Sequence, residues 1–245
     1  MMWALDYYEE VKKLFEWIKT NQMENIKKGS EKIAECLKKD GMIHCFGTGH
    51  SHSLCEEIFY HAGGLVPVNM ILVPAATLQE GLFFSTAVEG SPNLIPSILE
   101  RNNIEEKDVM IVVSLSGRNF MPIDMALEAK KRGLYVIAIS STAQAAAGKT
   151  KHPGGKNLLE IADLVIDNRG VPGNAILEKE GLPSRVGGTQ IVTGSLIMEM
   201  LVVQAMEECV NMDFIPPIMY CPNLPGGKEH NREAFRKYKN RIKAF

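Results

Sequence analysis

The sequence predicts an α/β protein: a three-layer α/β/α sandwich with a mainly parallel five-stranded sheet, preceded by a pair of N-terminal helices. Short apolar runs alternate along the chain with segments of helical periodicity, a pattern typical of strands that are covered by helices on both faces. Two of the apolar runs end in glycine- and serine-rich loops at a strand-to-helix junction. The length of 245 residues suits one such domain or two small ones.

Residues 4–39 carry the periodicity of the N-terminal helical pair. Two apolar faces appear at helical spacing: Leu5, Tyr8, Val11, Phe15 and Ile18, and then Ile26, Ile33 and Leu37. Gly29-Ser30 is expected to separate the two helices, and Gly41 to end the segment. Because these helices have more apolar surface than the sandwich needs, residues 1–40 are expected to form a dimerisation unit.

The alternation of strands and helices begins after Gly41. Five runs are expected to be strands: residues 42–46, 66–73, 109–113, 134–139 and 164–166. Four segments are expected to be helices: residues 54–62, 96–101, 123–132 and 189–210. With their connections they form the predicted sandwich domain, residues 41–212.

Two segments lack this alternation. Residues 170–188 have no clear periodicity and are rich in glycine. Such a segment is expected to be either a lid that closes over a ligand or a disordered loop. The chain after residue 212 is rich in proline and then predicts a basic helix over residues 228–243. Residues 213–245 are therefore expected to form a C-terminal tail and helix.

The two loops carry the strongest functional signal. Residues 47–52 read Gly-Thr-Gly-His-Ser-His, and residues 114–119 read Ser-Leu-Ser-Gly-Arg-Asn. Glycines let the backbone approach an anion, and the free N–H groups and dipole of a helix N-terminus favour negative charge. Serine hydroxyls add rotatable donors. Two such loops predict one phosphorylated ligand that is held from two sides.

Composition and charge exclude several classes of protein. The formal net charge of −2 indicates neither nucleic acid nor an anionic membrane as a partner. The first residues lack the pattern of a signal peptide, and the apolar stretch 191–210 carries three glutamates, which favours a buried helix over a membrane span. The five cysteines show no C-x-x-C pair, as in reduced cytoplasmic proteins.

Three cofactor interpretations fail, two of them on single positions and the third on residue spacing. His52 stands where a dinucleotide loop needs its third glycine, and Ala143 where a nucleotide-triphosphate loop ending in Gly148-Lys149-Thr150 needs its first. The histidine spacings match no zinc motif. We therefore expect no cofactor and no metal. His44 alternates with apolar residues of a predicted strand and is expected to lie in the core.

The loops resemble those of the sugar isomerase (SIS) family of phosphosugar-binding domains. Gly47-x-Gly49-x-Ser51-His52 is similar to the first loop of phosphoheptose isomerases, and residues 114–119 resemble the second phosphate loop of the family. Residues 184–190 resemble a loop of the N-acetylmuramic acid 6-phosphate etherases. The stretch 223–227, with His230-Asn231, is similar to a poorly characterised bacterial group, UPF0309-like, of this family.

The resemblance implies a flavodoxin-like sheet and a sugar phosphate as ligand. The implied binding residues come from the two loops and the third block: Gly47, Gly49, Ser51, His52, Ser114, Ser116, Gly117, Arg118, Asn119, Ser184 and Thr189. His61 falls where relatives place a glutamate acid/base, Glu89 falls near a second etherase glutamate, and Glu80 is the next candidate carboxylate. These positions imply a sugar-phosphate isomerase or lyase that works by proton transfer, or alternatively a non-catalytic sugar-phosphate regulator. They also imply a homodimer or homotetramer, with His230 as a candidate to reach a neighbouring site.

Overall fold

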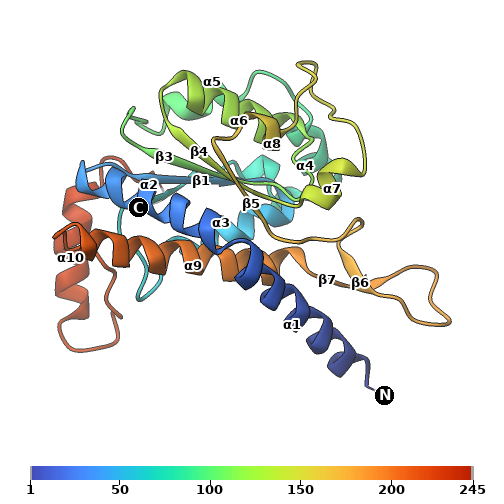
Figure 1. Cartoon of the computed structure of the whole chain (residues 1–245). Coiled ribbons are helices and arrows are strands. Elements are labelled where there is room, and N and C mark those ends of the chain that lie inside the picture. The colour runs from blue at the N-terminus through green and yellow to red at the C-terminus, as the bar shows by residue number, and fades with distance from the viewer. Residues whose placement is uncertain (1, 244–245) are drawn as a thin grey trace.

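The computed structural model describes residues 2–243, which form a parallel sheet between two layers of helices (Figure 1). The five strands are β1 (Ile43–Gly47), β2 (Val68–Met70), β3 (Val109–Val113), β4 (Tyr135–Ser140) and β5 (Leu164–Asp167). They lie in the order β2-β1-β3-β4-β5, and every neighbouring pair is parallel. The predicted three-layer sandwich with a flavodoxin-like strand order is confirmed.

The strands are buried on both faces, so alternate residues enter two separate cores. Ile43 and Cys45 of β1 belong to the core under the helices α2 (Met23–Lys38), α3 (His52–Ile58) and α9 (Gln190–Asn211). Phe46 of β1, together with Met110 and Val112 of β3, belongs to the opposite core. That core lies under α5 (Ile95–Glu100), α6 (Phe120–Lys131) and α8 (Leu158–Ile161) (Figure 1).

The break between the N-terminal helices lies at Gln22 and not at Gly29-Ser30. The helix α1 spans Trp3–Asn21, and Gly29 lies inside α2. A Cβ at Gly29 would stand 2.9 Å from the Leu201 side chain of α9, so the glycine allows a close helix–helix contact. The Ser30 hydroxyl donates to the Leu201 carbonyl at 3.0 Å. The Gly-Ser pair therefore serves helix packing and does not terminate a helix.

Two other expectations about element bounds are wrong. The helix α3 ends at Ile58, four residues early, and Tyr60 then adopts a positive φ of 58°. Residues 170–188 contain an antiparallel hairpin of β6 (Ala175–Leu177) and β7 (Val186–Gly188). The hairpin contacts α1, where the Tyr7 hydroxyl donates to the Gly188 carbonyl.

The remaining helices are short, except the last. The helix α4 (Leu82–Glu89) follows β2 through two short 3-10 turns, and α7 (Thr142–Ala146) follows β4. The basic helix α10 spans Gly227–Tyr238 and packs at the end of the molecule opposite the hairpin (Figure 1). Within residues 2–243, none of the helices has the length and apolarity that crossing a bilayer requires.

A buried polar network joins β1, β2 and β3 to the C-terminal segment. His44 Nε2 lies 3.0 Å from Asp108 Oδ2, and its Nδ1 accepts from the Asn69 amide at 3.0 Å. The same Asn69 amide donates to Asn102, which fixes its orientation and leaves Nδ1 of His44 as an unprotonated acceptor. Arg241 donates to Asp108 at 2.5 Å. His44 thus lies in the interior as expected, as a neutral imidazole.

This network predicts a loss of stability in mild acid. Burial lowers the pKa of His44 below its ordinary value of 6.5, although the Asp108 hydrogen bond acts in the opposite direction. Because the folded-state pKa is depressed, this contribution to stability is complete above about pH 6.5 and is lost as the pH falls below that value. We expect urea titrations to give a smaller free energy of unfolding at about pH 5 than at about pH 7. An imidazole resonance of His44 that titrates at or above pH 6.5 would contradict this assignment.

Candidate functional site

The two glycine/serine loops meet where the strand order reverses. β1 and β3 are neighbours, β2 lies on the outer side of β1, and the later strands continue on the other side of β3. Gly47 pairs with Val113, so both loops leave the sheet at the same level. Ligands of open α/β sheets bind at this kind of switch point.

A cleft of about 360 Å³ lies between the loops. Its lining residues come from six segments: Thr48, Gly49, His50, Ser51, Glu89, Ser114, Leu115, Ser116, Arg118, Asn119, Gln144, Lys151 and Gln190. The structure therefore brings Gly49, Ser51, Glu89 and most of the second loop to one site.

The first loop is shaped by Gly47. A Cβ at this position would stand 2.6 Å from the Ser51 carbonyl oxygen, so no side chain fits inside the turn. Gly49 has a positive φ of 53°. The turn brings the Ser51 hydroxyl to α9, where it accepts from Gln190 Nε2 at 2.7 Å. Because its oxygen is engaged by Gln190, the hydroxyl proton of Ser51 remains available to donate to a ligand.

The second loop is held by its own serines. Ser114 Oγ accepts from the Gly117 N–H at 3.1 Å, and Ser116 Oγ accepts from the Arg118 N–H at 3.4 Å. Gly117 has a positive φ of 60° and packs against Leu159. The loop ends at Asn119, the N-cap of α6, whose side chain makes no capping bond. No side chain caps the helix and its first turn contains no acidic residue, so the N–H groups of Phe120 and Met121 are available to an anion, whereas Pro122 has none.

The charges of the cleft favour an anionic ligand. Arg118 and Lys151 both line it, and neither has an acidic partner within residues 2–243. The Lys151 N–H donates to the Arg118 carbonyl at 2.9 Å, which holds the two cationic residues side by side. Glu89 at the end of α4 is the one carboxylate of the lining, and its Oε1 accepts from the Thr48 hydroxyl at 2.5 Å. Glu89 is the last residue of the helix, and Gly90 follows it as the C-cap.

Several predicted residues lie outside the lining. Gly47 and Gly117 shape the loops from behind. His52 is buried, and burial lowers its pKa, which the Glu56 carboxylate offsets only in part. Ser184 lies exposed in the turn of the hairpin, and Thr189 is fully buried. The Thr189 N–H donates to the Asn174 side chain, so this residue positions the start of α9 and does not face the cleft.

His61 does not reach the cleft of its own chain. It follows the end of α3, and its Nε2 lies 3.2 Å from Glu199 Oε1 on α9. Glu199 is nine residues beyond Gln190 of the cleft, which places it about 14 Å along the helix. Burial raises the pKa of Glu199, although the nearby His61 acts to lower it. His61 and Glu89 are therefore not paired within one chain. His230 stacks on Tyr220, with ring centroids 3.6 Å apart, and also lies outside the lining.

Sequence reasoning missed Gln144 and Lys151. Both flank the Gly148-Lys149-Thr150 stretch, which resembles a nucleotide loop only in part. Gln144 lies in α7, whose N-cap Ser141 donates its N–H to the Leu115 carbonyl, and Lys151 lies after α7 and donates its N–H to the Arg118 carbonyl. Gln190 directly follows the predicted residue Thr189. Its position at the start of a helix, after Gly188-Thr189, was the sequence feature that could have identified it as a lining residue. Within the described part of the chain, no three His, Cys, Asp or Glu side chains are grouped to hold a metal ion.

The chain is similar to known proteins in sequence and in fold. The sequence pattern of the SIS domain matches residues 6–141. A UPF0309 protein of Geobacillus thermodenitrificans is 37% identical over 236 residues, which cover 96% of this chain and 95% of that protein. A UPF0309 protein of Listeria innocua is 38% identical over 237 residues, which cover 97% of this chain and 96% of that protein. A phosphoheptose isomerase from Francisella tularensis has a similar fold, with a TM-score of 0.54, 14% identity, and 82% and 95% of the two chains covered.

Proposed function

Because the chain belongs to the UPF0309 family of SIS-domain proteins, we propose that it binds a sugar phosphate in the cleft and transforms it by proton transfer. The observation that carries the proposal is the meeting of two anion-binding loops at the switch point of the sheet. The names of structural neighbours, which include phosphoheptose isomerases, support a phosphosugar as the ligand class.

The phosphate would occupy the cationic end of the cleft. The free N–H groups of α6, the Asn119 side chain and the Ser116 hydroxyl can donate to its oxygens. Arg118 and Lys151 supply two positive charges that no acidic residue neutralises within residues 2–243. The Ser51 hydroxyl would donate from the other loop. This arrangement suits a phosphate dianion better than a neutral sugar.

The chemistry would be the transfer of a proton beside a carbonyl group of the sugar. Isomerisation of an open-chain sugar and elimination of a neighbouring ether both begin with such a step. Glu89 is the carboxylate that the cleft offers as general base and acid. The Thr48 hydroxyl donates to Oε1 of Glu89, which leaves Oε2 to exchange a proton with the ligand. We propose an isomerase or a lyase of this kind.

We also propose that copies of the chain assemble as a dimer or tetramer. Trp3, Leu5 and Tyr8 on α1 are exposed, although they continue the apolar pattern of the helix. A helix end that leaves apolar side chains in water favours a partner on that side. His61 with Glu199 would then serve the cleft of a second copy. Sedimentation as a monomer at micromolar concentration would exclude this assembly.

Loss of one loop hydroxyl is expected to weaken the binding of sugar phosphates. Ser51→Ala and Ser116→Ala each remove a donor to an anion, which typically contributes about 1.5–3 kcal/mol. Calorimetric titration with the best ligand from a thermal-shift panel of sugar phosphates would measure the change. Ser184→Ala, outside the lining, is the matched control and should leave affinity unchanged. Equal affinities in all four proteins, wild type included, would show that the site is elsewhere.

A further inference from the structure

A second cavity lies at the β2 edge of the sheet and shares no lining residue with the cleft. Its volume is about 470 Å³, within the usual range of sites for small molecules. The walls come from the loop after β2, from the end of α5, and from the C-terminal segment: Met70, Leu72, Val73, Pro74, Ile98, Arg101, Asn102 and Lys243. We call this cavity the edge pocket.

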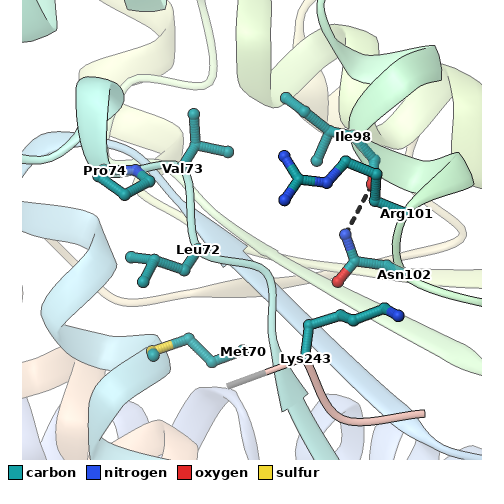
Figure 2. A pocket seen from close by; sticks show the side chains of 8 residues that line it. All are labelled: Met70, Leu72, Val73, Pro74, Ile98, Arg101, Asn102 and Lys243. Carbon is teal, nitrogen blue, oxygen red and sulfur yellow. Dashed lines mark hydrogen bonds between the residues drawn. The ribbon is translucent and has the colours of Figure 1, made fainter. Parts of the chain in front are cut away.

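The edge pocket has two chemically different sides. Figure 2 shows Met70, Leu72, Val73 and Pro74 along one wall, which is apolar throughout. Arg101, Asn102 and Lys243 stand on the opposite wall, and the Arg101 side chain extends across the space toward Val73. A ligand that fills this space would present an apolar surface to one wall and a polar group to the other.

The two cations of this wall have no partner among residues 2–243. Two acidic groups of the segment that follows are engaged by other cations: Glu105 lies 3.0 Å from Lys107 Nζ, and Asp108 accepts from Arg241. Arg101 and Lys243 therefore present positive charges to the pocket that no ion pair among residues 2–243 neutralises. Asn102, which is 7% exposed, is held between them by bonds to Asn69 and to the Ile98 carbonyl. These hydrogen bonds fix the position of Asn102 in the polar wall.

We propose that the edge pocket binds a small organic anion, one phosphate or carboxylate group attached to an apolar body. The anionic group would bind the Arg101 guanidinium, which extends into the space, and Lys243 at the lower end of the same wall would add positive charge. The apolar body would cover Leu72, Val73 and Pro74. An inorganic anion would leave that wall in water, and a neutral aromatic molecule would leave the cations unpaired. Both are expected to bind more weakly.

Phenyl phosphate is a suitable probe because it has both parts. The protein would be labelled on its methionine methyl groups, and the Met70 resonance, assigned through Met70→Leu, would report occupancy of the edge pocket by NMR. We expect a saturable shift of Met70 in the wild type. The double variant Arg101→Gln/Lys243→Gln should raise the Kd by at least about tenfold.

Two controls separate this site from the cleft and from unspecific binding. Lys151→Gln, which alters the cleft, should leave the Met70 titration unchanged. Inorganic phosphate and phenol should each need at least about tenfold higher concentrations for the same shift. An unmoved Met70 resonance at about 10 mM phenyl phosphate, or the same Kd in the double variant, would overturn the proposal.

Discussion

Glu89→Gln is expected to lower the turnover of a sugar phosphate by about 10²–10⁴-fold, the usual contribution of a general acid or base. Glutamine has nearly the shape of glutamate, and its amide oxygen can still accept from the Thr48 hydroxyl. The variant loses only the ability to take up and release a proton. Its affinity for the ligand should therefore stay close to that of the wild type. Turnover and calorimetric affinity, measured on the same preparations, would test this separation.

Glu80→Gln is the matched control for this prediction. Glu80 belongs to a 3-10 turn before α4 and does not line the cleft. Its replacement should leave turnover within about twofold of the wild type, since a solvated carboxylate outside the site carries no proton of the reaction. The acid/base assignment of Glu89 is wrong if its variant turns over at the wild-type rate. Tight binding without any turnover in the wild type would instead favour a sugar-phosphate sensor.

The role proposed for His61 has its own readout in the same assay. If His61 serves the cleft of a second copy, His61→Gln should also lower turnover. Mixing it with Glu89→Gln should then restore part of the activity, because a mixed dimer contains one cleft with both residues intact. Two variants that stay inactive after mixing and subunit exchange would contradict the proposal that His61 serves the cleft of a second copy.

The part of the site that could be predicted consists of residues that are close together in the sequence. A strand, a glycine/serine turn and a helix are consecutive in sequence, so residues 47–52 and 114–119 could be recognised without any knowledge of the fold. Lys151 reaches the cleft through a backbone bond to Arg118, 33 positions away in the chain, and no local pattern encodes this contact. The hairpin in residues 170–188 was missed for a related reason. Its strands are three residues each and contact α1, which lies far away in the sequence.

Gly29 and His61 show how a correct pattern can carry a wrong interpretation. A Gly-Ser pair inside a helical segment suggests a break, but here it allows α2 to approach α9 closely. The helix after the first loop was expected to include His61, but it ends at Ile58, and the residue turns toward Glu199 instead. In both cases a tertiary contact with α9 decides the outcome, and that helix is formed from the far end of the chain.

The least predictable part of the fold is Asp108, a buried carboxylate at the end of the sheet where β1 and β3 begin. Asp108 is charged and directly precedes a predicted strand, which in sequence resembles a solvated loop residue. Its side chain is nevertheless fully buried. It accepts from the Met42 and Glu105 N–H groups, at 2.9 and 2.7 Å, as well as from His44 and Arg241. Burial would raise the pKa of Asp108, but the hydrogen bonds from His44 and the backbone outweigh it and lower the pKa.

Asp108→Ala is therefore expected to destabilise the protein by about 3–5 kcal/mol, since it leaves His44 and the Met42 and Glu105 N–H groups without their acceptor and removes one of the two carboxylates that contact Arg241. Urea unfolding would measure the loss. Glu105→Ala is the control, because Glu105 contacts the same arginine from a side chain that is 47% exposed, and such pairs contribute about 0–1 kcal/mol. A similar loss in both variants would mean that the buried network adds no more than a surface ion pair. A much larger loss for Asp108→Ala would show that one carboxylate ties the starts of β1 and β3 to the C-terminal segment.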